Sequence, residues 1–107
     1  MKTDSRIIIS IDKQFYSEND EIKIHVWLNR NFYSPPILTI LSPTGRKIDS
    51  ALLKSHEDTT ETFAFTCGGP FMFENGYYTI RVESDNIVSE TMFEYYKKSN
   101  QNPSPFR

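Results

Sequence analysis

The sequence has a single cysteine, Cys67, so no internal disulfide can form. One cysteine and two histidines match no zinc-ligand spacing, and we expect Cys67 to be a buried, unreactive thiol. A chain of 107 residues is long enough to bury one core without disulfide or metal support. It is too short for two domains.

The chain also lacks a long apolar run. Residues 7–9 form an isoleucine run that is too short for a signal peptide or a membrane-spanning helix. We therefore expect no membrane insertion. The expected compartment depends on the chain start: cytoplasmic if Met1 is native, and extracellular or at the cell surface if the chain is excised from a longer one.

There is no excess of positive charge. The formal net charge is −2, and Lys47, Lys54, Lys97 and Lys98 are scattered or lie near the C-terminus. Proteins that grip nucleic acid through its phosphates usually carry a basic stripe. The sequence therefore predicts no nucleic-acid partner.

No catalytic or cofactor motif is present: the chain has no Gly-x-Ser-x-Gly, no phosphate loop and no Gly-x-Gly-x-x-Gly. His25 falls on the polar face of an expected strand, and His56 lies in a polar loop beside Glu57 and Asp58. We predict that the protein is not an enzyme, with no catalytic residue, no cofactor and no metal site.

No segment shows a sustained helical period, whereas apolar residues alternate with polar ones along much of the chain. Seven such segments read as strands, and they cover residues 6–13, 21–29, 37–41, 46–54, 60–67, 77–84 and 87–96. Short strands at this spacing predict an all-β fold, an antiparallel immunoglobulin-like β-sandwich of about seven strands. The domain should span residues 1–96, with residues 97–107 as a flexible tail or linker.

The segments between these strands carry turn chemistry. Residues 14–20 read as a loop, the Ser-Pro-Thr-Gly at 42–45 predicts a tight turn, and Ser-Asp-Asn at 84–86 predicts a hairpin. Residues 46–54 are the expected edge strand. Unpaired edge groups would also allow edge-strand self-association, which the lysines and arginine of this segment could oppose.

Residues 68–76 combine Gly-Gly-Pro and Asn-Gly with three large apolar residues between them. In extended backbone Phe71 and Phe73 would point the same way. We expect at least one of them to close the end of the core, with Met72 outside. The alternative is an exposed contact patch.

The blocks IIISIDKQFYSENDEIKIHV, ILTILSPTGRKI, TFAF and NGYYTIRV resemble immunoglobulin-like or fibronectin-III-like repeats of microbial, especially archaeal, surface proteins, and macroglobulin-type domains. The matching positions are Asp12, Lys13, Tyr16, Asp20, Pro43, Gly45, Gly76, Tyr78, Ile80 and Val82. Asn19 replaces the usual glycine, and asparagine tolerates left-handed backbone. Tyr78 stands where a tyrosine corner would bond its hydroxyl to backbone.

The candidate binding residues are aromatic or apolar. Trp27 should face away from the core unless a bulge reverses the register, and with Phe32 and Tyr33 it forms the candidate partner-contact cluster, to which we add Met72. Asp12, Glu18, Asp20 and Glu21 surround one loop and offer oxygen ligands for calcium, although Asp20 could equally cap the turn.

These observations favour a non-catalytic structural or protein-interaction module, a domain or accessory subunit of a larger surface assembly. Its expected partner is a protein whose identity the sequence leaves open. The alternative is an extracellular carbohydrate- or calcium-binding adhesion domain, which would display exposed aromatic residues and an acidic loop. Fold resemblance alone does not choose between these functions.

Overall fold

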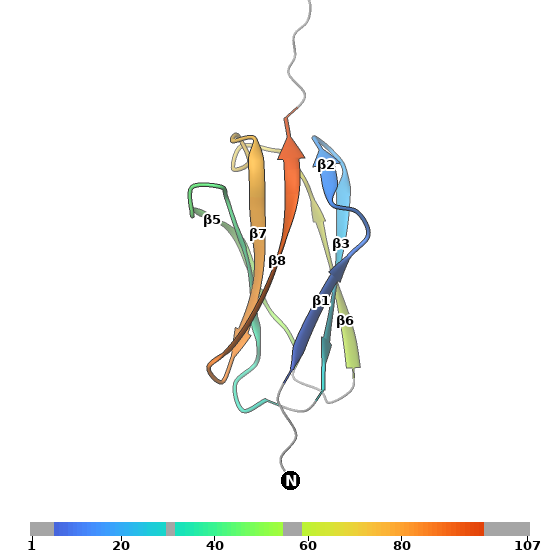
Figure 1. Cartoon of the computed structure of the whole chain (residues 1–107), viewed down its shortest axis with the longest axis vertical. Helices are drawn as coiled ribbons and strands as arrows, with labels where there is room; N and C mark the ends of the chain where they lie inside the picture. Colours follow the sequence, from blue (N-terminus) through green and yellow to red (C-terminus); the bar gives the residue numbers. More distant parts are fainter. Residues whose placement is uncertain (1–5, 30–31, 55–58, 98–107) are drawn as a thin grey trace, which may run out of the picture.

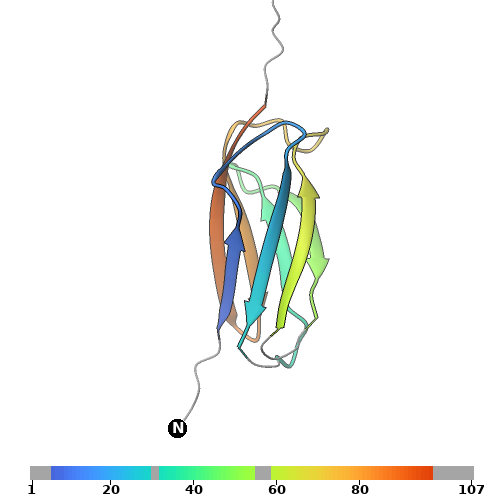
Figure 2. The same ribbon diagram turned by 90° about the vertical axis from the view of Figure 1, so that its right-hand side faces the viewer.

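The computed structural model describes residues 6–29, 32–54 and 59–97, which form two stacked β-sheets (Figures 1 and 2). None of these residues is in a helix, so the described part of the chain contains no helix that could cross a membrane. The eight strands are β1 (Ile7–Ile11), β2 (Phe15–Ser17), β3 (Glu21–Leu28), β4 (Ile37–Leu41), β5 (Lys47–Leu52), β6 (Thr59–Thr66), β7 (Gly76–Ser84) and β8 (Ile87–Tyr96).

One sheet has three strands in the order β1-β3-β6, and the other has five in the order β2-β8-β7-β4-β5. All pairs are antiparallel except that of β2 with β8. The fold is therefore the predicted all-β sandwich, and β5 is an edge strand as expected. Residues 98–107, which the predicted tail includes, lie outside the described residues.

The loop predicted at residues 14–20 is wrong in part, because residues 15–17 form β2. The chain leaves the small sheet after β1, crosses between the layers and pairs in parallel with the end of β8. The amide of Glu94 donates to the carbonyl of Gln14 at 2.9 Å and extends this pairing. Three residues are too few to show an alternating pattern, so only the neighbouring strand creates this element.

The core contains the inward residues of both sheets. Ile24, Leu38 and Ile80 are fully buried, whereas Phe65 is half-buried and packs against the core. Phe93 and Tyr95 are the inward pair of β8, as predicted. Alternation along each strand places these side chains between the layers, where burial of apolar surface stabilises the fold.

The turns follow their sequence signals. Asn19 has φ +74° in the turn before β3, and Asp85 and Asn86 have φ +50° and +68° in the β7–β8 hairpin. Gly45 has φ +90°, and its amide donates to the Ser42 carbonyl at 2.9 Å. Asparagine, aspartate and glycine tolerate this left-handed backbone better than other residues do, so these turns were readable locally.

Candidate interaction surface

The loop between β6 and β7 has the reverse of the predicted arrangement. Met72 is fully buried, whereas Phe71 and Phe73 are 62% and 58% exposed. The expected two-residue alternation holds only for extended backbone, and here the Met72 amide closes a turn on the Gly69 carbonyl at 3.4 Å. Pro70 takes the second position of that turn, which its fixed φ favours. Met72, not Phe71 or Phe73, closes the end of the core.

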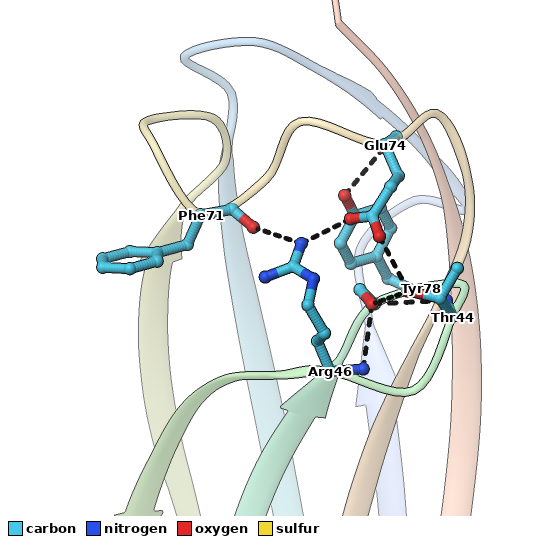
Figure 3. A network of polar contacts seen from close by, with 6 residues as sticks. Thr44, Arg46, Phe71, Glu74 and Tyr78 are labelled. Atoms are coloured by element: carbon cyan, nitrogen blue, oxygen red, sulfur yellow. Dashed lines mark hydrogen bonds and ion pairs between the residues drawn. The ribbon is translucent and has the colours of Figure 1, made fainter.

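Arg46 fixes this loop from the turn between β4 and β5 (Figure 3). Its guanidinium donates to the Phe71 carbonyl at 3.1 Å, forms an ion pair with Glu74, and lies 4.3 Å from the centre of the Phe73 ring. Thr44 donates to the other Glu74 oxygen at 2.8 Å. One side chain therefore holds both exposed phenylalanines in place through backbone, charge and cation–π contacts.

Tyr78, near the start of β7, holds the same loop from the core side. Its buried ring stacks on Phe93, with centroids 5.6 Å apart, and its hydroxyl donates to the Glu74 carbonyl at 2.7 Å. This contact confirms the predicted tyrosine-corner role. The hydrogen bonds from Arg46 and then Thr44 lower the pKa of the Glu74 carboxyl. The stability that the ionised Glu74 carboxylate gives the loop is therefore fully present above the ordinary pKa of a glutamate, and it is lost as the pH falls through the lowered pKa.

Three further exposed aromatic residues lie at the same end of the molecule, on the outer face of the large sheet. Phe15 of β2 and Tyr96 of β8 meet edge to face with centroids 5.5 Å apart, and both are about half exposed. Tyr77 of β7 pairs with Glu94, which lies between Phe15 and Tyr77 in register and accepts the Tyr96 hydroxyl at 2.7 Å. Cross-strand pairing therefore gathers residues from three segments of the chain.

We call this part of the molecule the aromatic end, defined by Phe15, Phe71, Phe73, Tyr77 and Tyr96. These are five of the six exposed aromatic residues in the described part of the chain. Of the five, the sequence predicts Phe71 and Phe73 only as the alternative, an exposed contact patch, and it does not predict Phe15, Tyr77 or Tyr96 as partner contacts. The available signal was their position outside the alternation of inward residues, as for Tyr77 and Tyr96 beside inward Tyr78 and Tyr95.

The predicted partner-contact residues do not form one surface. Phe32 is 5% exposed and Met72 is fully buried, so the prediction that they offer an accessible patch is wrong for these two. Trp27 is half-buried on the outer face of the small sheet, between Ile8 and Thr60 in register. Tyr33 is 96% exposed. Contact of a partner with Trp27 or Tyr33 stays a prediction.

Cys67 is buried at the end of β6, and burial raises the pKa of its thiol to about 12. The protonated thiol is a poor nucleophile and a poor metal ligand at neutral pH. This environment agrees with the expectation of an unreactive thiol.

In the acidic loop around β2, the Asp20 side chain forms a hydrogen bond within the turn itself. Asp20 accepts the Ser17 amide at 2.8 Å, and the Asp20 amide donates to the Ser17 carbonyl at 3.0 Å. Asp20 therefore caps the turn.

His25 contacts Thr62 at 2.9 Å on the outer face of the small sheet. Within residues 6–29, 32–54 and 59–97, no three His, Cys, Asp or Glu side chains gather as metal ligands would. His56 lies outside the described residues.

A shallow groove of about 450 Å³ lies at the opposite end, between the β7–β8 hairpin and the segment before β4. Asp85 in this groove accepts the backbone amides of Tyr33 and Ser34 at 2.8 and 3.2 Å. Its carboxylate therefore serves to hold the connection between the two sheets. Ser84 also lines the groove, and its hydroxyl donates to the Ser34 carbonyl in the same connection.

Known proteins resemble this chain in structure only. No family model and no curated protein sequence matches it. Among solved structures, it is similar to the CARDB domain of a Pyrococcus furiosus protein, a domain solved in complex with di-metal ions. The TM-score is 0.55 and the identity 12%, over 85% of this chain and 93% of that domain. The likeness shows the fold: the protein is an immunoglobulin-like β-sandwich.

Proposed function

We propose that the protein is a non-catalytic protein-interaction module, a domain or accessory subunit of a larger surface assembly, and that it binds a protein partner through the aromatic end. The observation that carries this proposal is the concentration of exposed aromatic side chains at one end of the sandwich. Large apolar side chains gathered on a surface mark an interface more often than scattered ones do.

The residues of the aromatic end are held in place by contacts within the protein. Arg46 holds the loop that carries Phe71 and Phe73, and the strands hold Phe15, Tyr77 and Tyr96. Tyrosine and other aromatic residues supply much of the binding energy in protein interfaces, and a prearranged surface loses less side-chain entropy on binding. Glu94, which lies between Phe15 and Tyr77 in the sheet, would favour a partner that has a basic residue among its apolar ones.

A paired-variant capture experiment tests the proposal. The Phe73→Ser/Tyr77→Ser double variant removes two rings that are 58% and 56% exposed, whereas Tyr33→Ser removes a 96% exposed ring at the opposite end. We expect the double variant to lose a partner that the wild-type protein retains from extracts of its source. The Tyr33→Ser control should retain that partner, and all three proteins should melt within a few degrees of one another. Equal capture by the double variant would refute the proposed surface.

A further inference from the structure

Each sheet ends in two edge strands, and in the described residues only one of the four is both long and unprotected. β2 has three residues, and β1 lies against β8. β5 pairs irregularly with β4 and carries Lys47 and Asp49. By contrast, β6 pairs with β3 in unbroken register and contains neither proline nor a basic residue. Charges, prolines and irregularities are the features that usually block edge pairing.

The free backbone groups of β6 can be assigned from the ladder. The Cys67 amide donates to the carbonyl of Asp20, the residue directly before β3, at 2.8 Å. In an antiparallel pair the backbone groups of successive residues alternate between the two sides. Phe65 and Phe63 therefore direct their backbone groups toward β3, while Thr66, Ala64 and Thr62 direct theirs toward the open edge.

The open part of this edge has definite limits. Near its start, the Lys54 amide donates to the Glu61 side chain at 2.7 Å, which places the chain after β5 beside that residue. The open run is thus residues 62–66. Phe63 and Phe65 in this run are only half-buried, and Thr62, Ala64 and Thr66 are exposed on the outer face. An added strand would cover the two phenylalanines further.

We propose that a second copy of this chain occupies this edge, with the two β6 strands antiparallel about a twofold axis at Ala64. Ala64 then faces its symmetry mate, Thr62 faces Thr66 of the other copy, and Phe63 faces Phe65 of the other copy on the core side. The three-stranded sheets join into one six-stranded sheet. Residues 62–66 share no member with the aromatic end, and this proposal does not depend on the proposed function.

The charge pattern suits a self-pair. The only charged residue of β6 is Glu61, and in this register it faces Cys67 of the other copy, so the two glutamates stay apart. Opposed threonines and opposed phenylalanines are favourable cross-strand partners. A pair of five-residue strands buries less than the roughly 1,200 Å² of stable interfaces, so the dimer should form only at high protein concentration.

Charge swapping at the symmetry position tests the proposal, because Ala64 is exposed and its substitution leaves the core intact. Ala64→Lys and Ala64→Glu each place like charges directly opposite one another, which is destabilising, whereas Ala64→Thr retains a neutral strand-forming residue. By sedimentation velocity from micromolar to millimolar concentration, wild type and Ala64→Thr should approach a twofold increase in mass. Each charged variant alone should stay monomeric.

An equimolar mixture of Ala64→Lys and Ala64→Glu should dimerise again, and added salt should weaken this mixed dimer. Circular dichroism checks that every variant is folded. A wild-type protein that stays monomeric at millimolar concentration would overturn the proposal. Two other results would also overturn it: dimers of the charged variants as strong as those of wild type, or a mixture that fails to associate.

Discussion

At the scale of single residues, two buried tyrosines that look alike in the sequence play different parts. Both are fully buried and lie edge to face with centroids 5.6 Å apart. The Tyr78 hydroxyl donates to the Glu74 carbonyl. The Tyr95 hydroxyl has no hydrogen-bond partner among the described residues, and burial raises the pKa of Tyr95 to about 12. A buried polar group without a partner carries a desolvation cost that a paired one offsets.

Two matched substitutions measure this difference. Tyr78→Phe removes a hydrogen bond and leaves the Glu74 carbonyl without it, so the free energy of unfolding should fall by about 1 kcal/mol. Tyr95→Phe removes an unpaired hydroxyl, so the free energy of unfolding should stay the same or rise. Urea denaturation at neutral pH compares them. Equal losses for both variants would contradict the assignment.

At the scale of elements, the β6–β7 loop shows where a pattern misleads. The rule that residues two apart point the same way assumes extended backbone, and Gly68 and Gly69, with φ +105° and +81°, remove that condition before Phe71 is reached. Met72 then turns inward, and the Gly68 amide donates to its sulfur at 3.3 Å. The glycines were visible in the sequence, but the direction of the loop they produce was not.

Truncating Met72 and Phe73 one at a time tests which of these side chains belongs to the core. Met72→Ala removes fully buried atoms, so the free energy of unfolding should fall by about 2–5 kcal/mol. Phe73→Ala removes a largely exposed ring and its contact with Arg46, which should cost about 1 kcal/mol or less. Thermal and urea unfolding provide the comparison. If Phe73→Ala were the more damaging change, the phenylalanine would belong to the core after all.

At the scale of the whole molecule, the N-terminal segment joins the two sheets. β1 belongs to the small sheet and β2 to the large one, and Tyr16 lies fully buried between them, edge to face with Phe93 at 5.6 Å. The Lys13 amide donates to the Tyr16 hydroxyl at 3.0 Å, so the crossing itself is fixed. One core shared by both layers should unfold as one unit.

Two spectroscopic signals test this cooperativity. The fluorescence of Trp27 reports on the small sheet, whereas far-ultraviolet circular dichroism reports on every strand. We expect the two urea unfolding curves to coincide in midpoint and slope. An earlier fluorescence transition would mean that the small sheet unfolds separately.

The sequence by itself determined the strands with a clear alternation, the turns at Asn19, Gly45 and Asp85–Asn86, and the sandwich class. These features depend on backbone preference and side-chain period, which are local properties. The burial of Tyr78 and of Cys67 was also predictable, because each lies two residues from an inward residue of its strand, and the resemblance to a tyrosine corner implied the bond of the Tyr78 hydroxyl to backbone.

Only the tertiary structure decided the pairing of β2 with β8, the inward turn of Met72, and the burial of Phe32. It also decided that Phe15, Tyr77 and Tyr96, which are far apart in the chain, form one surface. Each of these outcomes depends on which segments meet in space. A sequence pattern records the faces of each strand, whereas the neighbour that covers a face is chosen by the packing of the whole core.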